Sequence, residues 1–314
     1  MEMTLTKKRR PLVSIGMPVY NAERYVRQSI ESLQNQTYDH FELIISDNAS
    51  TDATIDICQE LARHDERIAL VRCDKNLGAA KNYNKVFHLA QGVHFKWAAS
   101  DDLCAADYLA RCVAVLEDDA SVILAYPKTI LIDEFGNKLR DYDDGLHLKS
   151  KSASGRFLQL VYSVGECNAV FGLIRSDVLK KTRLIGNYIG SDVCLLAELS
   201  LLGRFYEIPD YLFCRRHHPG ASSYHKDVKS QLQFFDPSLH GQLALQSWRH
   251  LFEHFKSLRR ADIRATQKLL PTAYLLGSLV VSGDRYFKEL LTACEFHCGR
   301  FRRKVRAIHL QRGM

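Results

Sequence analysis

The first hundred residues alternate short, apolar, β-branched stretches with amphipathic helical ones, and this alternation constrains the fold more than any other feature. Leu12 to Met17 has the composition of a strand covered on both faces. The other predicted strands are Phe41 to Ser46, Ile68 to Cys73 and Val93 to Ala98, and the predicted helices are Ala22 to Gln34, Ala53 to Arg63 and Ala79 to Ala90. The pattern predicts an α/β fold with a mostly parallel sheet flanked by helices.

Each predicted strand runs into a polar turn. The polar residues that follow the strands are Asn21, Asp47, Asp52, Asn76, Asp101 and Asp102. In open sheets of this kind ligands bind beyond the carboxyl ends of the strands, so these residues mark the expected site. The sequence contains neither G-x-G-x-x-G after the first strand nor G-x-x-x-x-G-K-[ST], which argues against dinucleotide oxidoreductases and P-loop enzymes. A nucleotide bound here would need carboxylates, a metal and a few amides.

The composition is that of an ordinary soluble protein, with 46% hydrophobic and 25% charged residues. The best candidate for a membrane span, Leu269 to Val281, is shorter than the roughly 18 residues required and contains Pro271, so it predicts a buried helix. Nine irregularly spaced cysteines predict reduced thiols and a cytoplasmic protein. The net charge of +7 is concentrated from Lys256 onward, where thirteen Lys or Arg residues accompany four acids. An anionic membrane surface, an anionic substrate or solubility would each explain this basic end.

The adjacent acids Asp101 and Asp102 point to a cation. Two neighbouring carboxylates repel each other unless a cation or basic group compensates, and Mg²⁺ or Mn²⁺ takes carboxylate oxygens and leaves positions for a diphosphate. The alternative is that Asp102 caps a helix beginning near Ala105. Further upstream, Asp52 is expected to cap the helix that starts near Ala53, and Asp47 to accept hydrogen bonds from a base or ribose.

Four ordered motifs resemble those of family 2 glycosyltransferases. They are Pro11-Leu-Val-Ser-Ile-Gly-Met-Pro-Val-Tyr-Asn21, Ile45-Ser-Asp47-Asn-Ala-Ser-Thr-Asp52, Asn76-Leu-Gly78 and Ser100-Asp101-Asp102. The resemblance covers about Pro11 to Ser223. It implies the GT-A fold and an inverting mechanism. It also implies that the donor nucleotide is held by Pro18, Tyr20, Glu23, Asp47 and either Lys81 or Asn82.

The metal motif departs from the family pattern. The family usually has Asp-x-Asp, and the aligned triplet here is Ala99-Ser100-Asp101, so the first acid is missing. The last acid, which usually touches the metal, remains as Asp101 with Asp102 beside it. The resemblance therefore still implies Mn²⁺ or Mg²⁺ as cofactor.

A second cluster lies further along the chain. Asp192 precedes an apolar helix and resembles the family's catalytic base, although as a first-turn acid it also has a purely structural explanation. Arg215 and Arg216 would neutralise the diphosphate, with His218 joining the metal; the alternative is a solvated turn. Glu166 and Asn168 are predicted acceptor contacts, although Phe171 to Ile174 also fits a core strand.

These features predict transfer of a sugar from a nucleotide diphosphate sugar to a hydroxyl acceptor, either a surface polysaccharide or a lipid-linked glycan. The alternative is a non-catalytic sugar-nucleotide-binding or membrane-scaffolding protein. We expect a catalytic domain over residues 1–225 and a basic helical region over 226–314, with helices at Leu243 to Leu258, Ile263 to Val281 and Arg285 to Cys294. Residues 300–306 suggest peripheral contact with the inner face of the membrane. No nucleic-acid recognition motif accompanies the charge.

Overall fold

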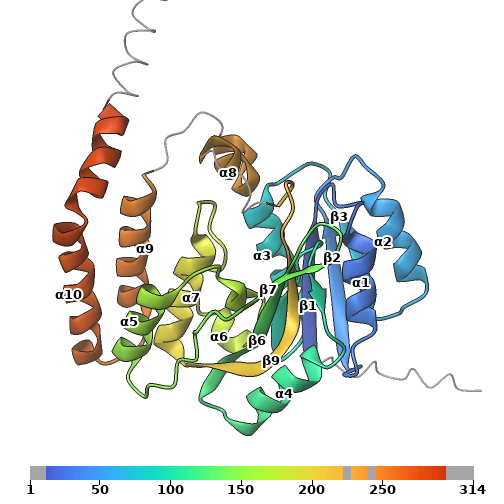
Figure 1. The fold of residues 1–314 in the computed structure, drawn as a ribbon, viewed down its shortest axis with the longest axis horizontal. Coiled ribbons are helices and arrows are strands. Elements are labelled where there is room, and N and C mark those ends of the chain that lie inside the picture. Colours follow the sequence, from blue (N-terminus) through green and yellow to red (C-terminus); the bar gives the residue numbers. More distant parts are fainter. Residues whose placement is uncertain (1–11, 222–227, 240–244, 295–314) are drawn as a thin grey trace, which may run out of the picture.

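The first strand, β1 (Val13–Val19), is buried along its whole length and lies inside the central sheet (Figure 1). It pairs in parallel with β2 (Phe41–Asp47) on one side and with β4 (His94–Trp97) on the other, and β2 pairs in parallel with β3 (Ile68–Arg72). The carboxyl ends of these strands therefore meet at one edge of the sheet, as the sequence predicts.

The computed structural model describes residues 12–221, 228–239 and 245–294. Most predicted boundaries in the first hundred residues hold within two residues, and the connecting helices are α1 (Val26–Gln34), α2 (Thr54–Arg63) and α3 (Ala79–Leu89). The start of α1 is the exception. Residues 23–25 form a turn in which the backbone N–H groups of Tyr25 and Val26 donate to the carbonyl of Ala22, and the regular helix begins only at Val26. The backbone N–H groups of Ala22 and Glu23 donate to Thr54 and Asp52. These bonds join the loop after β1 to the loop after β2.

The second half of the sheet mixes directions. The long strands β6 (Val122–Ile132) and β9 (Arg204–Arg216) pair in parallel, and the short β8 (Leu173–Arg175) bridges β4 and β6 in antiparallel register. The remaining strands are β5 (Leu103–Cys104), which pairs with β9, and β7 (Lys138–Tyr142), which pairs with β6. The sheet order is β3-β2-β1-β4-β8-β6-β9-β5.

The alternative interpretation of Asp102 as a helix cap is wrong. The next helix, α4 (Tyr108–Asp118), begins later than expected because β5 intervenes and pairs with β9. The Asp102 carboxylate instead accepts the backbone N–H of Arg216 at 2.9 Å.

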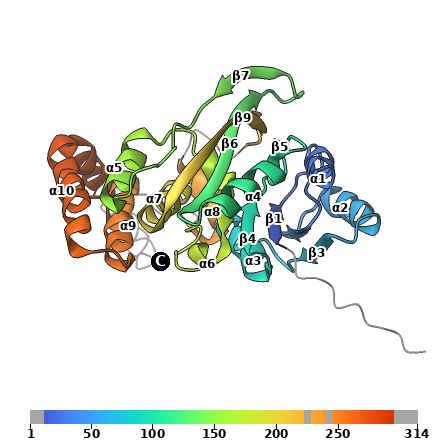
Figure 2. The same ribbon diagram turned by 90° about the horizontal axis from the view of Figure 1, so that it is seen from below.

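Helices from the second half of the chain gather on one side of the sheet, opposite α1 and α2 (Figure 2). They include α5 (Ala153–Ser163), α7 (Ser191–Leu202), α9 (Gln246–Arg260) and α10 (Ala265–Val281). The chain is again helical over 283–294, so the predicted C-terminal helices are confirmed. The short helices η1 (Asn168–Phe171), α6 (Ser176–Leu179), α8 (Val228–Phe235) and η3 (Pro237–Leu239) complete the described elements.

Helix α10 is more exposed than its apolar sequence predicts. We expected Leu269 to Val281 to be buried, but within α10 only Pro271 and Leu275 are. Leu269 is 67% exposed and Val280 is 84% exposed. Within the described part of the chain, no helix has both the length and the apolarity needed to cross a membrane.

A buried ionic cluster ties α9 to the rest of the molecule. Arg183 contacts the carboxylates of Glu198 on α7 and Glu253 on α9, and all three side chains are almost inaccessible. The Arg183 guanidinium also donates to the backbone carbonyl of Glu253 and to Ser257. The outer charges Arg249, Lys256 and Arg260 add ion pairs to the two glutamates.

Replacing Arg183 with Met should lower the free energy of unfolding by about 3 kcal/mol, because two buried carboxylates would lose their shared internal cation. Arg27→Met is the matched control. It breaks an exposed pair with Glu60 and should cost less than about 1 kcal/mol. Urea unfolding of both variants measures the difference, and equal losses would show that the cluster contributes no more than a surface pair.

Candidate active site

A cavity of about 750 Å³ opens at the carboxyl ends of the parallel strands. Its volume is in the range of small-molecule and cofactor sites. Eight of the predicted site residues line it: Pro18, Tyr20, Asn82, Asp101, Asp102, Arg215, Arg216 and His218. The fold thus brings together residues that are up to two hundred positions apart, from the end of β1, the loops after β1 and β4, helix α3, and the end of β9 with the loop that follows it.

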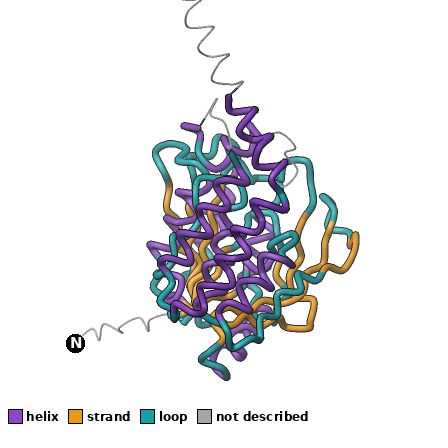
Figure 3. Tube along the Cα trace, turned by 90° about the vertical axis from the view of Figure 1, so that its left-hand side faces the viewer, coloured by secondary structure: helices purple, strands orange, loops and turns teal. Residues whose placement is uncertain are grey.

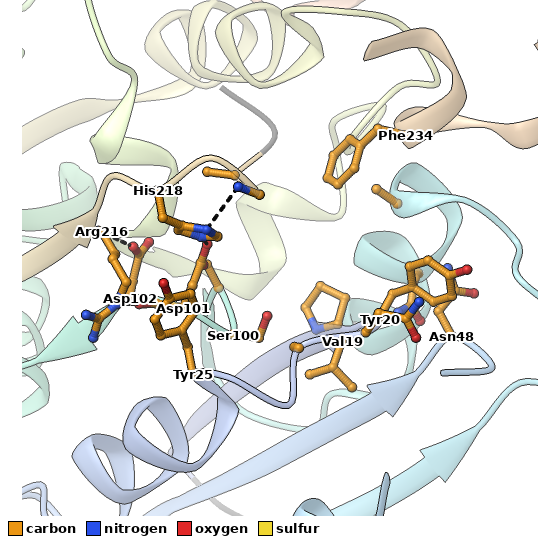
Figure 4. A pocket seen from close by; sticks show the side chains of 18 of the residues that line it. Val19, Tyr20, Tyr25, Asn48, Ser100, Asp101, Asp102, Arg216, His218 and Phe234 are labelled. Carbon is orange, nitrogen blue, oxygen red and sulfur yellow. Dashed lines mark hydrogen bonds and ion pairs between the residues drawn. The ribbon is translucent and has the colours of Figure 1, made fainter. Parts of the chain in front are cut away.

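Asp101 and His218 point toward one another in this cavity (Figure 4). His218 Nε2 lies 2.9 Å from Asp101 Oδ2, and His218 Nδ1 accepts the backbone N–H of Gly220 at 3.2 Å. The neutral imidazole therefore carries its proton on Nε2 and donates it to Asp101. The ring of Tyr25 packs against His218, with 4.7 Å between ring centroids. Together these contacts fix the orientation of the imidazole.

The predicted metal ligands differ in whether their side chains face the cavity or are occupied by other groups of the protein. Asp101 and His218 converge and line the cavity. Asp102 is buried, its carboxylate accepts the Arg216 backbone N–H, and burial together with the charge of Asp101 raises the pKa of Asp102. No cluster of three or more His, Cys, Asp or Glu side chains suited to a metal occurs among the described residues. Two protein ligands still fit Mn²⁺ or Mg²⁺, because such ions keep waters and bind substrate phosphates alongside one or two carboxylates.

Arg216 is a structural residue in this arrangement. Its guanidinium donates to the backbone carbonyls of Asp101, Asp133 and Glu134 and to Gln28 Oε1. The guanidinium also lies 4.6 Å from the centroid of the Tyr25 ring. It therefore holds the Asp101 loop against the turn between β6 and β7, and its predicted contact with a diphosphate stays untested.

Arg215 joins the predicted diphosphate and acceptor residues into one cluster. Its Nη1 donates to the backbone carbonyl of Glu166 at 2.5 Å and to Asn168 Oδ1 at 2.7 Å. Glu166 also pairs with His217 at 3.2 Å and with Arg140 at 3.1 Å. The alternative interpretation of this segment as a solvated turn is wrong, because Arg216 is buried and the Arg215 side chain is only 18% exposed.

On the nucleotide side, Asn82 is the most informative residue. It is buried beside the cavity and donates to the backbone carbonyl of Ser46 at 2.8 Å. Its Oδ1 is buried and has no hydrogen-bond partner among the described residues, so it is an unsatisfied acceptor at the wall of the cavity.

Three other predicted nucleotide contacts lie outside the cavity lining. Asp47 is fully buried, accepts the backbone N–H of Ser50 and pairs with Arg72 at 3.2 Å. Glu23 accepts the backbone N–H of Ala53, and Lys81 is exposed, 3.9 Å from Asp236. Their roles stay predictions.

Asp192 lies in the first turn of α7, as predicted, with its Oδ1 2.9 Å from the backbone nitrogen of Val193. It lies outside the lining of the cavity, and its role as a base stays a prediction. The loop before it is held by α9, where His250 Nε2 donates to the backbone carbonyl of Ile189 at 2.7 Å. Gly190 has φ +75°, and a Cβ there would lie 2.5 Å from the His250 ring. The absence of a side chain at Gly190 therefore allows α9 to pack directly against the loop that precedes Asp192.

Sequence analysis missed several residues of the site. Tyr25 was not among the predicted contacts, and Phe234 on α8 lies beyond the family motifs, across the cavity from Val19 (Figure 4). Lys96 had a visible signal, a lysine inside an otherwise apolar strand. It is fully buried behind Asp102, donates to the backbone carbonyls of Phe171 and Trp97, and lies 4.4 Å from the Tyr108 ring centroid.

Comparison with known proteins identifies the class. Residues 14–183 match the family model described as Glycosyl transferase family 2. Since this segment is more than half of the chain, the protein belongs to family 2 of the glycosyltransferases, and the predicted GT-A architecture is confirmed by the solved structures it matches.

Among particular relatives, the Escherichia coli chondroitin synthase is 29% identical over 233 residues, which cover 73% of this chain and 32% of the relative. The Staphylococcus aureus TarS fragment in complex with UDP matches with TM-score 0.60 at 18% identity, covering 85% of this chain and 71% of that one. The Pyrobaculum calidifontis mannosyltransferase PcManGT, in complex with GDP-Man and Mn²⁺, matches with TM-score 0.51 at 16% identity, covering 91% of this chain and 87% of that one. The chain spans less than two thirds of the length of most of the curated relatives it matches first.

Replacing Gly190 with Ala should lower the rate of sugar transfer at least tenfold, because the new Cβ would push the Asp192 loop off His250. Gly145→Ala is the matched control. Gly145 also has positive φ, but its Cβ would meet no atom within 4 Å, so both variants carry about 1–2 kcal/mol of backbone strain and only one carries the clash. Steady-state kinetics of both variants measures the rates, and equal rates would contradict a role for the contact between the Asp192 loop and His250.

Proposed function

We propose that this chain is an inverting glycosyltransferase that moves a sugar from a nucleotide diphosphate sugar to a hydroxyl acceptor. The observation that carries the proposal is the Asp101–His218 pair, placed in a nucleotide-sized cavity at the carboxyl ends of the parallel strands. Membership of family 2 supports it, as do structural neighbours in complex with UDP and GDP-Man.

The donor diphosphate would lie beside Asp101, His218 and Arg215. A bound Mn²⁺ or Mg²⁺ would supply positive charge to the departing diphosphate. Arg215 lines the same cavity, and its permanent charge would stabilise the negative charge that develops on the leaving group. Arg216 and Tyr25 would contribute indirectly, because they hold Asp101 and His218 in place without contacting the donor themselves. Their contribution is the preorganisation of the site.

Asp192 would take the proton of the acceptor hydroxyl as that oxygen attacks the anomeric carbon. Attack from the face opposite the diphosphate inverts the configuration, and no covalent bond to the protein forms. Glu166 and Asn168, already joined to Arg215, would contact acceptor hydroxyls. Donor and acceptor sites would thus share one network of hydrogen bonds.

For the acceptor we propose a surface polysaccharide or a lipid-linked glycan, met at the inner face of the membrane by a cytoplasmic protein. The relation to a chondroitin synthase supports a polysaccharide. We place the catalytic domain within residues 1–225 and treat 226–314 as an attached helical region. Residues 300–306, the predicted membrane contact, lie outside the described residues.

Titration with a panel of nucleoside diphosphates, with and without Mn²⁺, tests the donor site. The wild type should bind one nucleotide selectively, and Mn²⁺ should tighten this binding. Asp101→Ala should lose the effect of the ion, since His218 alone would remain as ligand. A folded wild type that binds no nucleotide would overturn the proposal and favour a scaffolding protein. Metal-independent binding that ignores the substitution would overturn the assignment of Asp101.

Asp192→Asn should lower kcat by about 10²–10⁴ and leave the Kd for the donor nucleotide unchanged, because the amide cannot accept the proton. Asp177→Asn, in the first turn of α6, is the matched control for the loss of a first-turn acid. It should change stability by about 0.3–1 kcal/mol at most and leave kcat unaffected. If Asp192→Asn behaves like this control, Asp192 is a structural acid only.

A further inference from the structure

The outer face of α10 is a continuous exposed apolar surface. We define this α10 face by six side chains that are all exposed: Leu269, Leu270, Tyr274, Leu276, Val280 and Val281. The sequence carries no charged residue between positions 269 and 283. A contiguous apolar surface of this kind on a soluble domain marks an interaction site.

Helix geometry explains why these residues share one face. Residues three, four and seven positions apart lie on the same side of a helix, so Leu269, Leu276 and Val280 form a stripe. Leu275 points the other way and is buried. A Cβ at Gly277 would meet no atom within 4 Å, so the described chain leaves the middle of the α10 face open, in agreement with the exposure of the six side chains.

The α10 face is directed away from the catalytic cavity. In Figure 1 α10 is the outermost helix on the left, and Figure 3, which looks at that side, shows a layer of helices. Helix α10 packs on α5 and α9. A partner could therefore lie along this layer while the cavity at the strand ends stays open.

The charges around the α10 face identify the kind of partner. Between residues 256 and 294 six exposed side chains are basic: Lys256, Arg259, Arg260, Arg264, Arg285 and Lys288. Lys256 and Arg260 already pair with Glu253 and Glu198, so Arg259, Arg264, Arg285 and Lys288 are the cations available to a partner. Only Asp262 and Asp284 are exposed acids in that range. A second copy of this chain, docked about a two-fold axis, would bring the same excess of cations together. An anionic lipid surface would instead attract them.

We propose that α10 docks this protein on an anionic membrane surface, with the α10 face inserted among the lipids and the basic residues contacting the headgroups. The helix lies in the plane of the interface because its opposite side packs on α5 and α9, and no helix among the described residues is long and apolar enough to span a membrane. The contact is therefore peripheral and reversible.

Flotation of the full chain with lipid vesicles tests the proposal. Vesicles of phosphatidylcholine alone are compared with vesicles that also contain phosphatidylglycerol. The wild type should float with the anionic vesicles, and the double variant Leu269→Gln/Val280→Gln should partition at least tenfold less, since two inserted side chains become polar without a change in charge. The matched control is Phe135→Gln/Leu139→Gln, which alters two exposed apolar side chains at the β6–β7 hairpin and should bind like the wild type. Equal melting temperatures confirm that each variant is folded.

Three results would overturn the proposal. The first is a wild type that does not bind anionic vesicles. The second is binding that the α10 variant leaves unchanged, which would move the contact to another part of the chain. The third is a concentration-dependent dimer in lipid-free solution that the α10 variant abolishes, which would make a second copy the occupant of this face.

Discussion

The site depends on the contact between the end of β9 and the loop after β4. The Asp102 carboxylate accepts a hydrogen bond from the backbone N–H of Arg216, and the Arg216 guanidinium donates one to the backbone carbonyl of Asp101. These reciprocal bonds join strands that are distant in sequence, and they place His218 2.9 Å from Asp101. Lys96, buried behind Asp102, adds a positive charge beneath this contact. A pair of neighbouring acids that would otherwise repel each other is thereby held in one orientation.

The second constraint comes from outside the segment that matches the family model. That segment ends at residue 183, within the ionic cluster that Arg183 forms with α7 and α9. Helix α9 then supports the loop before Asp192 through His250, at a position where only glycine leaves enough room. The C-terminal helices thus contribute to the geometry of the proposed base as well as to stability. They also carry the α10 face, so one layer of helices links the proposed chemistry with the proposed membrane contact.

The sequence predicts the parallel half of the sheet and the position of the cavity well, because strand composition and the polar turns at strand ends are local signals. The resemblance places Asp101 and His218 on one ion, but nothing in the sequence predicts their direct hydrogen bond, since the pairing that brings β9 beside β5 is not encoded locally. Arg216 shows the same limit: a basic run suggests phosphate binding, and only the fold shows that its guanidinium is occupied by backbone carbonyls. The α10 prediction was wrong because apolarity indicates that a surface avoids water without indicating what covers it.

A crystal structure of this chain with Mn²⁺ and the nucleoside diphosphate that it binds would test the central claim most directly. The account predicts the diphosphate in the cavity beside Arg215, with the ion between Asp101 and His218 in place of their present hydrogen bond. It also predicts that Asp102 keeps its bond to the Arg216 backbone. A nucleotide bound elsewhere, or a diphosphate in the cavity with the Asp101–His218 hydrogen bond intact and no ion between them, would contradict it.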